Sequence, residues 1–124
     1  MQEMPEQPVP RVTHADVERV VRRDFPADQC GAVLSLLAEY GPERWHREVV
    51  RVHLAILRLS AGDLDNLRHE LEVAKCDYRD VLAYAEYPAC MRDRFKTFDL
   101  PLDEKKKILG QDWAQYRDWL QRRD

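Results

Sequence analysis

The stretch that decides the fold runs from Ser60 to Pro88, "SAGDLDNLRHELEVAKCDYRDVLAYAEYP", and holds no glycine or proline between Gly62 and Pro88. Within it, apolar residues recur at alternating spacings of 3 and 4. They are Leu64, Leu67, Leu71, Ala74, Tyr78, Val81 and Ala85. This heptad seam is typical of one helix packed along one side, and Asp63 stands where an N-cap is expected. We therefore predict a single helix over about 63–87.

The preceding segment, about 43–60, predicts the central helix of the fold. Its apolar residues lie on two sides, with Trp45, Val49, Val52, Ile56 and Leu59 on one and Val50, Leu54 and Leu57 on the other. A helix that is apolar over more than half of its circumference is expected in the middle of a fold. Together with 63–87 it predicts a long central helical hairpin.

Three further helices complete the expected bundle. Thr13 and Asp16 can form a capping box at the start of the first, and the Gly41-Pro42 pair is expected to end the second. The last helix turns four residues inward and contains a glycine that can divide it. The inward residues are Leu109, Trp113, Tyr116 and Leu120, and the glycine is Gly110.

The sequence thus predicts an all-α fold, a single-domain bundle of about five helices over 12–124. A flexible N-terminal tail is expected over 1–11, because this segment is polar and contains three prolines. A chain of 124 residues is long enough for one domain with a core of its own.

Composition narrows the function classes. The chain has 20 basic and 23 acidic residues and a net charge of −3, which disfavours nucleic acid as a partner. No apolar run approaches the ~20 residues that a membrane span requires, so no membrane partner is expected. The three cysteines form no CxxC pair, and the first residues do not resemble an export signal. These features favour a cytoplasmic location.

Candidate metal and catalytic residues are few. His46 and His53 are seven residues apart, as are His69 and Cys76, and seven residues of helix span ~10 Å. Neither pair can share one metal without ligands from elsewhere, so no metal or cofactor is expected. Asp80, one turn after Cys76, would raise the pKa of a thiol, which is the wrong direction for a nucleophile. We find no catalytic motif and expect no enzyme.

Two alternatives stay open at this level. The first is a nucleic-acid contact by a polar strip of Arg47, Arg51 and Arg58. The second is a small enzyme or metal site around His46 and His53, or around His69 and Cys76.

A second line of residues runs along the predicted 63–87 helix. We expect these residues to be buried by another surface, which could be the end of the same chain, another protein or a second copy of this chain. Tyr84 and Trp119 fall to the side of the main seams of their helices. The candidate interaction surface is His69, Val73, Asp80, Tyr84, Tyr87 and Trp119. We therefore predict a non-catalytic protein–protein binding module, an adaptor or an immunity-like inhibitor, or a self-associating helical protein.

The stretches "RVHLAILRLSAGDLDNLRHELEVAK" (Arg51 to Lys75) and "DYRDVLAYAEYP" (Asp77 to Pro88) resemble the shared core of a family of small, uncharacterised bacterial helical proteins. That family has no assigned reaction, cofactor or partner. The resemblance therefore implies a bacterial, cytoplasmic helical domain and transfers no functional residue.

Overall fold

The computed structural model describes residues 10–92 and 100–122, and these residues form seven helices and no strand. The helices are α1 (His14–Asp24), α2 (Ala27–Leu37), α3 (Val49–Ser60), α4 (Leu64–Cys76), α5 (Tyr78–Glu86), α6 (Pro88–Arg92) and α8 (Leu102–Gln121). The all-α, single-domain prediction is confirmed, with more helices than the five expected. The first nine residues of the predicted tail lie outside the described residues, whereas Pro10 is buried.

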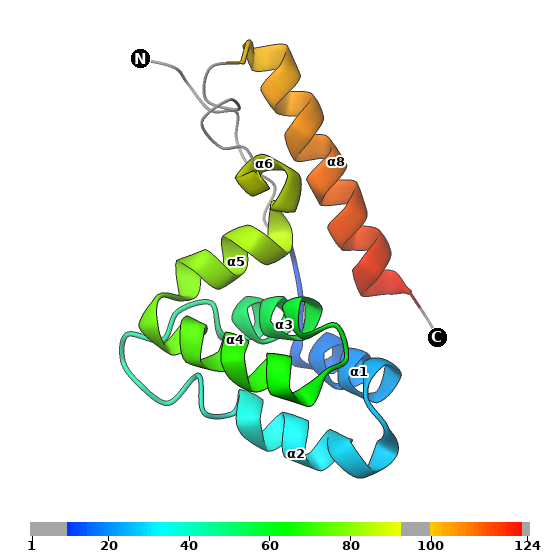
Figure 1. Cartoon of the computed structure of the whole chain (residues 1–124), viewed down its shortest axis with the longest axis vertical. Helices are drawn as coiled ribbons and strands as arrows, with labels where there is room; N and C mark the ends of the chain where they lie inside the picture. Colours follow the sequence, from blue (N-terminus) through cyan, green and yellow to red (C-terminus); the bar gives the residue numbers. More distant parts are fainter. Residues whose placement is uncertain (1–9, 93–99, 123–124) are drawn as a thin grey trace.

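Helix α3 lies at the centre and packs against α1, α4 and α5. Five of its apolar side chains are fully buried, namely Val52, Leu54, Ala55, Ile56 and Leu57. Figure 1 shows α1 to α5 gathered in the lower half of the view, with α8 extending away from them past α6. The predicted central position of this helix is confirmed.

Two of the predicted helix starts are found in the structure. The Thr13 N–H donates to Oδ2 of Asp16 at 2.9 Å, and the Asp63 carboxylate accepts the N–H of Asn66 at 2.9 Å. Each side chain satisfies a backbone N–H at or beside a helix start that has no partner within the helix. The second helix ends at Leu37, earlier than the Gly41 stop that we predicted.

The prediction of one helix over 63–87 is wrong. Asp77 has an extended backbone, with φ −155° and ψ 98°, and it separates α4 from α5. Its carboxylate accepts the N–H of Arg79 at 3.1 Å and caps α5. Aspartate competes with the helix for its own backbone in this way, so a break at this position costs little.

The heptad seam nevertheless points inward on both sides of the break. Leu67, Leu71 and Ala74 are buried on α4, and Val81 and Ala85 are buried on α5. Both helices pack against α3. The spacing of the seam therefore reflects contact with α3 and not continuity of the backbone.

The predicted start of the central helix at about residue 43 is also wrong. The helix begins at Val49, after Glu48 in a left-handed conformation with φ 53°. Trp45, which was expected on an apolar stripe of this helix, lies in the loop before it and is 61% exposed.

Side chains around Tyr40 explain why residues 41–48 form a loop. The Tyr40 hydroxyl donates to the Arg47 carbonyl at 2.8 Å and accepts the Arg47 N–H at 3.0 Å. Nδ1 of His46 accepts the N–H of Gly41 at 2.7 Å, and the His46 ring stacks on Tyr40 at 4.2 Å. Backbone groups that a helix would have used are thereby bonded to side chains.

Helix α8 is continuous through Gly110, so that glycine does not divide it. Leu109 and Tyr116 are buried as predicted, whereas Trp113 and Leu120 are only half-buried.

An unpredicted inward residue of α8, Asp112, accepts the N–H groups of Ala89 at 2.9 Å and Cys90 at 3.0 Å. This carboxylate fixes the start of α6 to α8. Because α8 also packs against α5, part of the cover predicted for the second side comes from the same chain.

Candidate functional site

A cleft of about 670 Å³ opens between α5, the α3–α4 turn and the C-terminal ends of α1 and α8. Its volume falls within the range of roughly 300–1,000 Å³ that is usual for binding sites. We call it the Arg58 cleft. The lining residues that carry the argument are Arg23, Arg58, Gly62, Tyr84, Trp119 and Arg122.

Arg58 comes from the last turn of α3 and lies against two aromatic rings of α8. Its Cζ atom is 5.3 Å from the centroid of the Trp119 ring and 6.0 Å from that of Tyr116. These are cation–π distances. Among the described residues, the Arg58 guanidinium makes no hydrogen bond and no ion pair. The aromatic rings therefore hold the charge in place without neutralising it.

Burial lowers the pKa of Arg58, and the nearby Tyr116 and Asp112 raise it again. An arginine stays protonated at any physiological pH, so the lowered pKa does not remove the charge. It indicates that the positive charge of Arg58 has lost part of its hydration without a compensating bond from the part of the chain that the structure describes.

Arg23 fixes the opposite wall of the cleft. One of its terminal nitrogens, Nη1, donates to the carbonyls of Trp119 at 2.7 Å and Arg122 at 2.8 Å. Its Nε donates to Asp24 at 2.7 Å. A cation on the last carbonyls of a helix satisfies acceptors that have no partner within the helix and suits the helix dipole. Arg23 thus ties the end of α1 to the end of α8 and holds Trp119 beside Arg58.

Gly62 allows the α3–α4 turn to approach α1. Its φ is +77°, and a Cβ at this position would lie 2.9 Å from the carbonyl oxygen of Asp24. Glycine adopts this backbone conformation without steric cost. The close approach brings the end of α3, and with it Arg58, next to Arg23 and Asp24.

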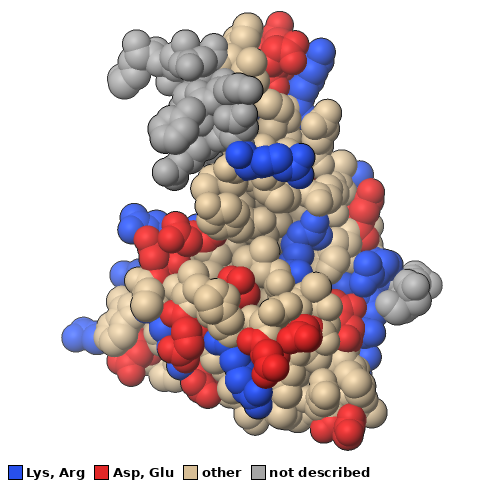
Figure 2. All heavy atoms as spheres, viewed as in Figure 1, with Lys and Arg blue, Asp and Glu red and all other residues tan. Residues whose placement is uncertain are grey.

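The cleft is positively charged in an acidic protein. It is lined by three arginines and one acidic residue, Asp24, whereas the whole chain has a net charge of −3. Asp24 is already bonded to Arg23 at 2.7 Å and to Arg122 at 3.4 Å. Figure 2 shows blue side chains in the valley between α5 and α8 and near the lower end of α8, with acidic side chains concentrated lower, over α4.

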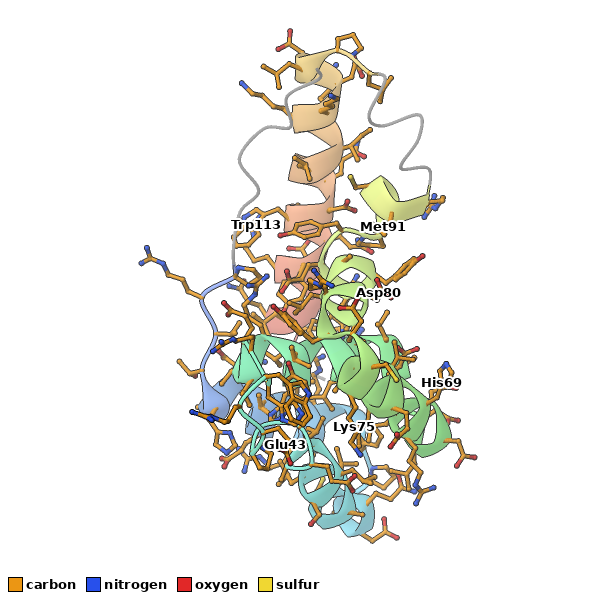
Figure 3. The ribbon with its side chains drawn as sticks, turned by 90° about the vertical axis from the view of Figure 1, so that its left-hand side faces the viewer. Glu43, His69, Lys75, Asp80, Met91 and Trp113 are labelled. Atoms are coloured by element: carbon orange, nitrogen blue, oxygen red, sulfur yellow. The ribbon has the colours of Figure 1, made fainter. Side chains whose placement is uncertain are left out.

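The structure brings two of the six predicted surface residues together in this cleft. They are Tyr84, which is 52% exposed, and Trp119, which is half-buried. His69 and Val73 belong to α4, and Asp80 lies on the first turn of α5; none of the three lines the cleft. Figure 3 shows His69 and Asp80 at separate positions along this side of the molecule.

The sixth predicted residue, Tyr87, is half-buried and lines a different hollow together with Arg51 and Met91. The six residues therefore do not form one continuous face, because the helix breaks at Asp77.

The three arginines of the predicted polar strip also separate. Arg47 lies in the loop before α3, and Arg58 lies in the cleft. Arg51 forms two hydrogen bonds to the carboxylate of Glu86, at 3.1 and 2.6 Å. Burial raises the pKa of Glu86 while Arg51 lowers it, and the ion pair raises the pKa of Arg51.

The candidate metal residues have other surroundings. Nε2 of His53 lies 2.8 Å from the Tyr40 carbonyl, and burial lowers the pKa of His53. His46 accepts the N–H of Gly41 in the loop before α3. His69 and Cys76 are exposed on α4. Within residues 10–92 and 100–122, no three His, Cys, Asp or Glu side chains gather in a way that could hold a metal ion.

Three residues of the site were not recognised from the sequence: Arg23, Gly62 and Arg122. Arg23 and its acceptors on α8 are separated by 96 to 99 residues, so no local pattern could relate them. Gly62 had a local signal, since a glycine after the last turn of a helix is typical of a left-handed conformation. The close approach to α1, which requires a glycine at position 62, could not be predicted from the sequence.

In the described part of the chain, no helix is long and apolar enough to cross a membrane. No family model matches the sequence, and searches among curated proteins and among solved structures also found no match. The resemblance to uncharacterised bacterial helical proteins therefore stays a prediction.

Proposed function

We propose that this protein is a non-catalytic protein-binding module and that the Arg58 cleft is its docking surface. The observation that carries the proposal is the Arg58 guanidinium, held against aromatic rings and without a counter-ion among the described residues, in the same cleft as the exposed Tyr84. Tryptophan, tyrosine and arginine are the residues most enriched among those that dominate binding energy at protein interfaces. All three types meet here.

The cleft is organised before any partner arrives. Arg23 lies 5.3 Å from the Trp119 ring and bonds the backbone at the end of α8, so it restrains the residue on which Arg58 stacks. Restraint of this kind lowers the entropy that a binding surface loses when it is occupied. It supports a role in recognition.

The lining residues favour binding over catalysis. They include no serine, threonine, cysteine or histidine, and the one carboxylate, Asp24, is held by two arginines. A hydrolase or transferase site needs a nucleophile with a base, or a free pair of carboxylates.

A cytoplasmic location is part of the proposal. Cys30 and Cys76 are free thiols, which supports a reducing compartment.

Site-specific photocross-linking in the cells of origin tests the docking surface. A benzoylphenylalanine in place of Tyr84 should form an adduct with one defined protein, and the adduct should disappear when Arg58→Gln is added. Trp45 provides a matched control, because it is another exposed aromatic, 61% against 52% for Tyr84, and does not line the cleft. The same adduct from both positions, or none from Tyr84, would contradict the proposal. An adduct of twice the mass of the chain would identify a second copy as the partner.

A further inference from the structure

We infer that the partner is an acidic protein segment that places a carboxylate against the N–H edge of Arg58. This inference rests on the proposed function, since it names the chemistry that the docking surface would recognise.

The aromatic contacts of Arg58 with Trp119 and Tyr116 engage its guanidinium as a cation over rings. They leave its N–H groups without an acceptor among the described residues. A guanidinium presents these donors in a planar fork that matches the two oxygens of a carboxylate. A planar, two-pronged anion therefore completes the site.

Two described carboxylates near Arg58, those of Asp24 and Asp112, are already engaged. Asp24 bonds Arg23 and Arg122, and Asp112 accepts two backbone N–H groups of α6. Neither can turn to Arg58 without breaking these bonds. Because the guanidinium is half-buried, an anion that reaches it gains more from the charge than it would at a fully exposed arginine.

The charges around the cleft favour a peptide over a nucleic acid. A protein that binds nucleic acid neutralises several phosphates, and its affinity depends on that number. Here Arg23 is committed to the end of α8, and the chain as a whole is acidic. The Arg58 guanidinium, which has no acceptor among the described residues, lies in a cleft with Trp119 and the exposed Tyr84 and suits a single carboxylate with apolar neighbours. An acidic peptide segment fits this arrangement better than a phosphate backbone.

A pair of peptide libraries tests the inference on the full chain. One library carries Asp and Glu at varied positions of short capped peptides, and the matched library carries Asn and Gln at the same positions. We expect binding from the acidic library only. The best peptides should lose at least about tenfold in affinity, ~1.4 kcal/mol, in Arg58→Gln. Arg58→Lys, which keeps the charge and loses the fork, should also weaken them.

Arg79→Gln is the control variant, because Arg79 is an exposed arginine of α5 that pairs with Asp77 and does not line the cleft. Its peptide affinity should equal that of the unmodified chain. Equal binding of the two libraries, or an Arg58→Gln variant that binds as well as the unmodified chain, would overturn the inference. So would inorganic phosphate or a single-stranded oligonucleotide that binds through Arg58 more tightly than the best peptide.

The two proposals fail in different ways. A partner that cross-links at Tyr84 while the libraries show no acidic preference would refute the carboxylate and leave the docking surface standing. Acidic peptides that depend on Arg58 without any cross-linked partner would refute the protein-binding function instead.

Discussion

Arg51 and Arg58 lie seven residues apart on α3, so they project from nearly the same side of one helix. Their surroundings differ completely. Arg51 holds Glu86 with two hydrogen bonds and lies 3.5 Å from Glu48. Arg58 lies against Trp119 and makes no ion pair with any described residue.

The charge of Arg51 stabilises the fold through an ion pair, whereas the charge of Arg58 stays available to a ligand. The Arg51–Glu86 pair joins α3 to α5, and Glu86 is only 2% exposed. Arg58 has lost part of its hydration and makes no ion pair within residues 10–92 and 100–122, which by itself destabilises the fold. Departures of this kind from stable packing are expected mainly at functional sites.

The largest effect should come from breaking the paired arginine. Arg51→Ala leaves the Glu86 carboxylate buried without a counter-ion, and the free energy of unfolding should fall by about 3–5 kcal/mol. Urea denaturation of the variant and the unmodified chain measures this difference in the free energy of unfolding.

The double variant Arg51→Met with Glu86→Leu is the control for that loss. It replaces the buried pair by apolar groups and should recover most of the lost stability. A loss of less than about 1 kcal/mol in Arg51→Ala would show that the pair is solvated and that the contrast with Arg58 is weak.

The second effect concerns His53, which lies between the two arginines on α3 and is buried. Because burial lowers its pKa, the unfolded chain takes up the proton first as the pH falls. The stabilisation from neutral His53 is therefore complete above about pH 6.5 and decreases below it, by at most ~1.4 kcal/mol per pH unit. Urea midpoints measured between pH 7.5 and pH 5 should show this loss.

His53→Gln keeps a donor for the Tyr40 carbonyl and removes the titration. The pH dependence should flatten in this variant. An unchanged slope would assign the titration to another group.

Much of the fold could be predicted because its signals are local. The caps at Thr13 and Asp63 depend on residues three positions apart, and the inward seam follows from helical periodicity. The break at Asp77 escaped prediction because one extended residue preserved the phase of that seam. The loop at 41–48 escaped because a tertiary cluster around Tyr40 and His46 competes with an apolar pattern that favours helix.

The candidate site was predictable only in part. Tyr84 and Trp119 were chosen because they lie beside the seams of their helices, and both line the cleft. The state of Arg58 could not be inferred, since it depends on contacts with Tyr116 and Trp119 of α8, which are distant in the sequence. The sequence places both arginines in one strip, and only the folded chain shows that one is neutralised.

The third effect is smaller for stability and larger for binding. Arg58→Gln removes two cation–π contacts of about 0.5–1 kcal/mol each and also removes a partly desolvated charge. These changes oppose one another, so the stability should change by less than about 1 kcal/mol. Acidic-peptide affinity, measured by calorimetry, should fall at least tenfold. A loss of stability close to that of Arg51→Ala would show that Arg58 is a structural residue after all.

The smallest effect on stability is expected for Tyr84→Ala. Tyr84 is 52% exposed and makes no ring contact with described residues, so truncation should change the free energy of unfolding by no more than about 0.5 kcal/mol. Peptide or partner affinity should still fall, because Tyr84 lies beside the open edge of the cleft. Val81→Ala, on the buried side of the same helix, is the matched control and should lose stability instead. If Tyr84→Ala destabilised the chain as much as Val81→Ala did, Tyr84 would belong to the core, and the cleft would lose its outer wall as a recognition surface.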